Sequence, residues 1–181
     1  MKYIDMLHET ELGNEALFSF IESSGFLDAP AASTPAHHGC YAGGLVDHSI
    51  AVAERICVKG GDKLDVFVAL VHDLCKAQLY IKLVTPEEKH GKTFLYRSDS
   101  SVASQGHGKL TLAIIDGCGI VLPDDAREAI EWHMGKWTKD ATDSVENIDE
   151  NQRILRSHIR SNKRLRAMCE ADMFASRVLG K

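Results

Sequence analysis

The chain has 181 residues, of which 44% are hydrophobic and 26% are charged, and its formal net charge at pH 7 is −5. This length suits a single domain spanning residues 1–181, and the acidic balance gives no general reason to expect nucleic acid or an anionic membrane as partner. The N-terminus lacks the apolar run of a signal peptide and no stretch reaches the roughly 20 apolar residues of a membrane span, so we expect a cytoplasmic protein.

Helical periodicity dominates the chain, and glycine, proline and polar residues mark its interruptions. The pattern predicts helices at residues 11–23, 44–58, 63–78, 106–117, 123–133 and 152–179, the last with a break near Ser161. Residues 28–39 and the acidic segment 140–150 are predicted loops. Two short β-prone segments, 79–84 and 93–97, predict a small hairpin. The expected fold class is therefore all-α, with a β-hairpin insertion at 79–97.

The five cysteines are odd in number, widely spaced and without a Cys-x-x-Cys pair. This spacing argues against a disulfide framework and against a zinc site built from thiolates. We expect reduced cysteines packed in the core: Cys40, Cys57, Cys75, Cys118 and Cys169. The sequence does not specify an oligomeric state.

The most informative feature is the pair His72–Asp73 within the otherwise apolar segment 66–76. Projected on a helix, His72, Asp73 and Lys76 share one side, while apolar side chains fill most of the circumference. Burying an imidazole and a carboxylate without partners costs several kcal/mol, and a shared divalent cation suits both groups. A solvated helix face is the alternative, but the apolar residues leave little room for one.

Four other side chains are candidate ligands, and three of them interrupt apolar stripes in the same way. His48 lies at the edge of a buried stripe, Asp172 lies in the middle of one, and His133 ends an apolar helix face. His107 begins a helix among glycines, which allow close approach of the backbone. A lone histidine in such a place is more often a core residue than a ligand, and only the convergence of several segments favours a metal site.

This series of residues resembles the HD-domain superfamily of metal-dependent phosphohydrolases, in particular its small stand-alone bacterial and phage proteins. The segment Gly43-Gly-Leu-Val-Asp-His48-Ser49 is similar to the first-histidine motif of the family. The other matching segments are Val71-His72-Asp73-Leu-Cys-Lys76, Gly106-His107-Gly108, Ala129-Ile-Glu-Trp-His133-Met-Gly135 and Ala171-Asp172-Met173. The resemblance covers residues 41–176 and implies a helical bundle in which the hairpin is a family-variable insertion.

The resemblance implies a ligand set for one or two divalent ions. A first ion would have four ligands, which are His48, His72, Asp73 and Asp172. Asp73 would bridge to a second ion that is also held by His107 and His133. Dinuclear members often supply a further histidine near the one that corresponds to His133. In this chain the neighbours of His133 are Trp132 and Met134. A set of imidazoles and carboxylates without thiolate suits Mn, Fe, Co, Ni or Zn.

The expected function is a metal-dependent phosphohydrolase that cleaves a nucleotide or a related phosphoester, monoester or diester, by a metal-activated water. Asp73 and Lys76 are the expected catalytic side chains, and Lys76 and Arg55 the expected phosphate contacts. His37 and His38 could approach the site, although a plain loop role is favoured.

Two alternatives remain open. One is a nuclease on single-stranded nucleic acid, attracted by a basic run made of Arg153, Arg156, Arg160, Lys163, Arg164 and Arg166. A solvated helix face or an interface is the simpler interpretation of that run, because few aromatic residues interleave to stack bases. The other alternative is a non-catalytic module that binds a nucleotide or a partner and retains the metal site.

Overall fold

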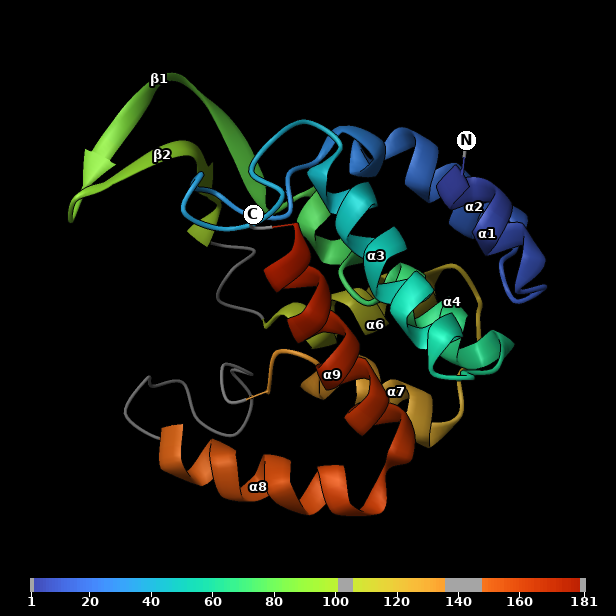
Figure 1. Ribbon diagram of the computed structural model, residues 1–181. Helices are drawn as coiled ribbons and strands as arrows, with labels where there is room; N and C mark the ends of the chain where they lie inside the picture. The colour runs from blue at the N-terminus through green and yellow to red at the C-terminus, as the bar shows by residue number, and fades with distance from the viewer. Residues whose placement is uncertain (1, 101–105, 136–147, 180–181) are drawn as a thin grey trace.

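The computed structural model of this chain describes residues 2–100, 106–135 and 148–179, and these are mainly helical. Helices pack around a common core, and a two-stranded antiparallel hairpin projects from one side (Figure 1). The α-helices are α1 Lys2–Glu9, α2 Glu15–Ser23, α3 Gly44–Val58, α4 Lys63–Val71, α6 His107–Gly117, α7 Asp124–Trp132, α8 Ile148–Ser161 and α9 Lys163–Val178. The predicted class, predominantly α with a small hairpin, is confirmed at this level.

The N-terminal region differs from the prediction of one helix at 11–23. Helix α2 begins only at Glu15, because the side chain of Asn14 caps it by accepting a hydrogen bond from the Leu17 amide at 3.0 Å. Residues 2–9 form the additional helix α1, which the sequence pattern does not predict. Tyr3 anchors α1 in the core by donating a hydrogen bond from its hydroxyl to the Leu70 carbonyl oxygen at 2.9 Å.

Helix α3 has the predicted bounds, whereas α4 is shorter than the predicted 63–78. It begins at a capping box formed by Asp62 and Asp65 and ends at Val71. Asp73 has φ −114° and ψ 21°, outside the helical region, and a short 3-10 helix, η2 Leu74–Ala77, follows it. The prediction that His72, Asp73 and Lys76 share one face of a continuous helix is therefore wrong. A turn, not a helix face, sets the direction of the Asp73 carboxylate.

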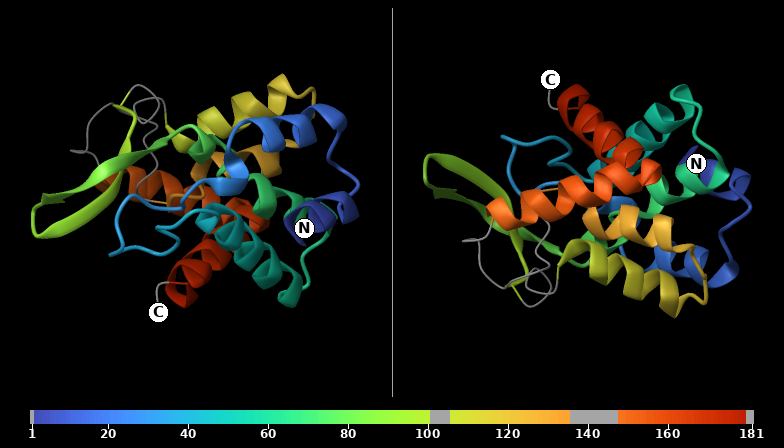
Figure 2. Two further views of the ribbon diagram at one scale, coloured as in Figure 1. Left: turned by 90° about the horizontal axis from the view of Figure 1, so that it is seen from above. Right: turned by 90° about the horizontal axis from the view of Figure 1, so that it is seen from below.

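The hairpin consists of β1 Tyr80–Lys89 and β2 Lys92–Ser98, with an irregular register between Lys82 and Glu87. It extends beyond the predicted segments 79–84 and 93–97. Strand β2 is fastened to the loop before α3, since the amide of Leu95 donates to the Ser33 carbonyl oxygen at 3.0 Å and the Thr34 hydroxyl donates to the Thr93 carbonyl oxygen at 2.7 Å. The loop and the hairpin therefore lie together on one side of the helices (Figure 2).

The C-terminal region contains two helices, α8 and α9, which meet at Asn162. The Asn162 side chain caps α9 by accepting from the Leu165 amide at 3.0 Å, which confirms the predicted break near Ser161. Helix α8 begins at 148, earlier than the predicted 152. Residues 140–147 of the predicted acidic loop lie outside the described residues, as do Ser104 and Gln105 before His107.

Buried apolar side chains from the helices form a continuous core cluster, and α8 packs against it through Ile154, Leu155 and Ile159. Phe67, Leu70 and Val71 of α4 lie at its centre with almost no exposed surface. Within the residues that the structure describes, no helix is both long and apolar enough to cross a membrane.

Helices α6 and α7 approach so closely at Gly108 that a Cβ atom there would lie 2.5 Å from the Cα and carbonyl oxygen of Glu131. We expect the substitution Gly108→Ala to lower the free energy of unfolding by about 1–3 kcal/mol, because one of the two backbones must move. Gly117 in the same helix has open space around it. Gly117→Ala should change stability by less than about 1 kcal/mol in urea unfolding. Equal effects of the two substitutions would contradict this close contact.

Candidate metal centre

Five polar side chains from four parts of the chain meet inside the helical core. His48 comes from the second turn of α3, His72 and Asp73 from the end of α4, His133 from the end of α7, and Asp172 from α9. Side chains of the first four are almost fully buried, with 0–2% of their surface exposed, whereas Asp172 is 20% exposed. These five residues are called the metal-ligand cluster below.

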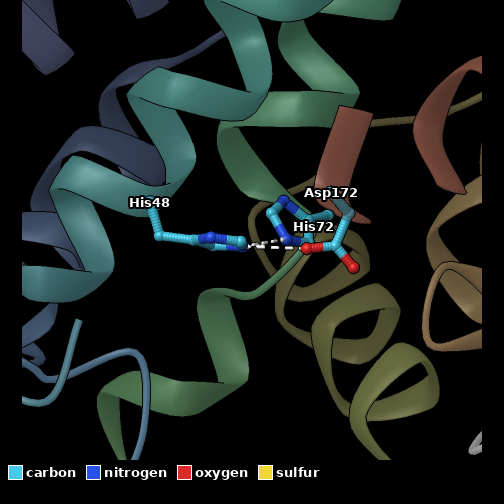
Figure 3. A group of neighbouring side chains, drawn as sticks. All are labelled: His48, His72 and Asp172. Atoms are coloured by element: carbon cyan, nitrogen blue, oxygen red, sulfur yellow. Dashed lines mark hydrogen bonds and ion pairs between the residues drawn. The ribbon is translucent and has the colours of Figure 1, made fainter. Parts of the chain in front are cut away.

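The first ligand group of the metal-ligand cluster contains His48, His72 and Asp172 (Figure 3). Nε2 of His48 lies 3.3 Å from Nε2 of His72 and 3.2 Å from Oδ1 of Asp172. Ligand atoms bound at about 2.0–2.2 Å to one ion stand roughly 3.3–3.6 Å apart in a tetrahedral arrangement. The spacing of these atoms therefore matches that of ligands to one metal ion.

The second ligand group contains His72, Asp73 and His133. The two oxygens of Asp73 face different histidines: Oδ2 lies 3.2 Å from Nε2 of His72, and Oδ1 lies 3.3 Å from Nε2 of His133. Oδ2 is also 3.8 Å from Nε2 of His48. His72 belongs to both ligand groups, and Asp73 of the second group lies between His72 and His133, with one oxygen toward each.

Backbone carbonyls determine which nitrogen of two histidines carries the proton. Nδ1 of His72 lies 2.8 Å from the Ala69 carbonyl oxygen, and Nδ1 of His133 lies 2.6 Å from the Ile130 carbonyl oxygen. A carbonyl oxygen only accepts, so Nδ1 must donate, and the Nε2 of each neutral ring carries a lone pair. Each Nε2 then points that lone pair at other ligand atoms, which is the tautomer that metal-binding histidines adopt.

Several buried polar atoms of this region have no hydrogen-bond partner among the described residues. They include Oδ1 of Asp73 and Nε2 of His133, which lie 3.3 Å apart without the angles of a hydrogen bond, and also Nδ1 of His48. A proton on Nε2 of His48 could serve the contact with Asp172 or the contact with His72, but not both. Unsatisfied buried groups each cost about 1–3 kcal/mol. The residues therefore fit a divalent cation, which would satisfy both imidazole nitrogens and carboxylate oxygens.

Lys76 supplies a positive charge beside the metal-ligand cluster. Its Nζ lies 2.6 Å from Oδ2 of Asp73, and its side chain is buried. Burial alone would raise the pKa of Asp73, but the ammonium of Lys76 and then the neighbouring histidines hold this pKa well below its usual range. Burial likewise opposes charge on Lys76, yet the Asp73 carboxylate outweighs it and raises the lysine pKa. The pair is a buried ion pair beside the ligand atoms.

Asp172 faces the same histidines from the more exposed side. Burial would raise its pKa, but the hydrogen bond from His48 and the electrostatic influence of the surrounding histidines lower the pKa to about 2. Cys75 behaves differently, because burial and then the Asp73 charge raise the pKa of its thiol to about 12. The thiol stays protonated and does not add a thiolate to the ligand set.

Two residues predicted for the site belong to neither ligand group. His107 begins α6 with its Nδ1 3.7 Å from Sγ of Cys75, so its role as a ligand of a second ion stays a prediction. Arg55 lies two turns along α3 from His48, and its guanidinium stacks 4.3 Å above the ring centre of Phe174. A phosphate contact by Arg55 also stays a prediction.

The sequence favours a plain loop role for His38, but the structure places it against the metal-ligand cluster. The ring of His38 lies 4.8 Å from the ring of His48, measured between centroids, and its Nε2 lies 3.4 Å from Oγ of Ser176. Burial, followed by the electrostatic influence of His48 and Lys76, lowers the pKa of His38 to about 4. His38 lies in an irregular loop, where helical periodicity gives no signal of direction. His37 is exposed.

Comparison of the chain with protein-family models, with curated proteins and with solved structures finds no match.

Proposed function

We propose that this chain is a metal-dependent phosphohydrolase of the HD type that cleaves a nucleotide or a related phosphoester. The observation that carries the proposal is the meeting of imidazole Nε2 lone pairs and carboxylate oxygens at 3.2–3.3 Å inside the core. Without a cation, a proton on Nε2 of His48 serves only one of its two contacts, and Oδ1 of Asp73 and Nε2 of His133 have no hydrogen-bond partner among the described residues, so the arrangement costs stability unless an ion binds. Its ligands would be His48, His72, Asp73, His133 and Asp172.

A divalent ion held there supplies a coordinated water of lowered pKa and stabilises negative charge on phosphoryl oxygens. The protein's own groups hold the ligand side chains in place. His72 and His133 are held in the ligand tautomer by the carbonyls of Ala69 and Ile130, so no rearrangement is needed before binding. Asp73 presents Oδ2 to His72, which both ligand groups share, and Oδ1 to His133, so these residues would hold either one ion or two.

Lys76 makes a phosphoester a better substrate for the metal-ligand cluster than a neutral molecule. The ammonium of Lys76 carries three donors, of which one is used by Asp73 at 2.6 Å. The remaining donors suit the oxygens of an anionic phosphoryl group. The apolar residues around the turn at 72–76 exclude bulk water, which strengthens this attraction.

The proposal is tested with protein purified without chelator and without a histidine tag. The protein is loaded in turn with Mn, Fe, Co, Ni and Zn and assayed against nucleoside phosphates and against aryl phosphate monoesters and diesters. We expect turnover that requires one of these ions and disappears with chelator. Tight nucleotide binding by metal-loaded protein without turnover of any phosphoester would instead favour the non-catalytic binding module.

A second candidate function, a nuclease on single-stranded nucleic acid, is favoured by one observation. Arg153, Arg156 and Arg160 project from one exposed face of α8 and line a shallow groove of about 520 Å³ with Ser157 and Ser161. Among the described residues these three arginines have no ion-pair partner, whereas Arg127 pairs with Asp116. Unpaired arginines along one helix suit successive phosphates of a nucleic-acid backbone.

The two functions differ in their dependence on this arginine stripe. If an oligonucleotide is the substrate, replacing the three arginines by alanine should weaken its binding and lower the slope of log affinity against log salt by about 2, at roughly 0.7 per phosphate contact. The matched control replaces three exposed lysines that pair with carboxylates, Lys2, Lys63 and Lys89, and so removes the same charge. Unchanged cleavage of a mononucleotide by both triple variants is the result expected for the phosphohydrolase, and it would exclude a role of the stripe in that reaction.

A further inference from the structure

The loop before α3 carries His38 to the metal-ligand cluster in a fixed position. The amide of Ala31 donates to the Gly39 carbonyl oxygen at 2.8 Å, which closes the loop. Gly39 has φ +66°, and a Cβ there would lie 2.7 Å from Cβ of Ala31 and 3.0 Å from the Gly44 carbonyl oxygen. A Cβ on Gly44 would lie 2.1 Å from the Gly39 carbonyl oxygen. These two glycines let the backbone next to His38 rest directly on the start of α3.

His38 bridges the two helices that supply His48 and Asp172 to the first ligand group. On α3 its ring packs beside the ring of His48, with 4.8 Å between centroids and an angle of 38° between planes. On α9 its Nε2 lies 3.4 Å from Oγ of Ser176, one turn after Asp172. His38 is nevertheless in neither ligand group of the described residues. Its imidazole therefore borders the ligands without being placed to join them.

His38 also marks the side of the metal-ligand cluster that faces solvent. The side chains of His48, His72 and Asp73 are 0–2% exposed, whereas Asp172 is 20% exposed and His38 is half-buried. A substrate phosphoryl group has to approach from the less buried side. On that side it meets the imidazole of His38, whose Nδ1 has no hydrogen-bond partner in the described part of the chain.

We propose that His38 is a substrate-contacting residue, which hydrogen-bonds an oxygen of the phosphoryl group bound at the metal centre. Ser176 holds the ring through its other nitrogen, so that the imidazole is oriented before substrate arrives. This inference rests on the proposed function, because it requires that a phosphoryl group binds at the metal-ligand cluster. It adds a residue outside the ligand set and outside the segments that resemble the HD-domain family.

The test compares the parent protein with His38→Ala, His38→Gln and the control His37→Ala, which alters the exposed neighbouring histidine. Metal content is measured first, and inorganic phosphate binding to each metal-loaded protein is then measured by calorimetry. We expect unchanged metal content in all four proteins. Phosphate affinity should fall about 3- to 10-fold in His38→Ala, as for loss of one hydrogen bond. It should recover in part in His38→Gln, whose amide can still donate, and stay at the parent value in His37→Ala.

Failure of the role proposed for His38 can be distinguished from failure of the proposed function. Equal phosphate affinity of the parent and His38→Ala would overturn the role of His38 while leaving the proposed function intact. Loss of metal from His38→Ala would make His38 a ligand and would overturn its role as a substrate contact. A metal-loaded parent that binds no phosphate and hydrolyses no phosphoester would refute the proposed function and this inference together.

Discussion

Replacing Asp73 by asparagine should abolish metal binding at the metal-ligand cluster and reduce hydrolysis by about 10³-fold or more, equivalent to about 4 kcal/mol in the reaction barrier. Asparagine keeps the size of the side chain but removes its charge and one of the two oxygens that face His72 and His133 at 3.2 and 3.3 Å. The measurements are metal content after dialysis against each ion and the rate with the best substrate. Asp47→Asn is the matched control, because Asp47 is next to His48 in the sequence but is exposed. This variant should retain the metal content and the hydrolysis rate of the parent.

Loss of metal must be separated from loss of folding, because Asp73→Asn leaves the buried ammonium of Lys76 without its partner. Breaking a buried ion pair from one side costs about 3–5 kcal/mol. The double variant Asp73→Asn/Lys76→Met removes both charges and should regain part of this stability in urea unfolding. It should still bind no metal. If folded Asp73→Asn or the folded double variant held as much metal as the parent, Asp73 would not be a ligand.

The second large effect is expected for Lys76→Met. In the metal-free protein this substitution leaves the Asp73 carboxylate buried without the ammonium that is its main counter-charge, so we expect the free energy of unfolding to fall by about 3–5 kcal/mol. Bound metal replaces the missing positive charge, and the loss should therefore be smaller in metal-loaded protein. Urea unfolding with and without the ion measures the difference. Hydrolysis by the metal-loaded variant should fall about 10²-fold, as for loss of a charged group at the phosphoryl oxygens.

The control for Lys76→Met is Lys63→Met, which breaks the exposed ion pair with Glu11 at 2.8 Å. Exposed pairs contribute at most about 1 kcal/mol, so this variant should unfold almost as the parent does, with or without metal. A loss below about 1 kcal/mol for metal-free Lys76→Met would contradict the view that Lys76 is the main counter-charge of Asp73.

Helices whose ends are marked by glycine or polar residues could be predicted from the sequence. Glycine pairs precede and follow α3, and the polar residue Asn162 separates α8 from α9. The end of α4 could not, since residues 66–76 contain no glycine or proline and their apolar pattern continues past the true end. The backbone of Asp73 leaves the helical region there, and its side chain contacts His133 and Lys76, which lie outside α4. Local propensity carries no information on such contacts.

The metal-ligand cluster was accessible to sequence reasoning because each member is a polar residue in an apolar stretch, which requires a partner. The structure brings His48, His72, Asp73, His133 and Asp172 together, although the expected helix face is replaced by a turn. His38 gave no comparable signal, because it lies in a loop whose path is fixed by the contact of Gly39 with Gly44. Such a contact between two glycines cannot be recognised from spacing alone.

The most direct test of the central claim is the metal stoichiometry of the protein, measured by elemental analysis and by calorimetric titration after purification without chelator or histidine tag. The account predicts one or two divalent ions per chain and a rise in thermal stability on binding, because the ion binds the folded state. Failure to bind any of Mn, Fe, Co, Ni and Zn after reconstitution would show that the buried histidines and carboxylates are not a metal centre, and would remove the basis of the proposed hydrolase.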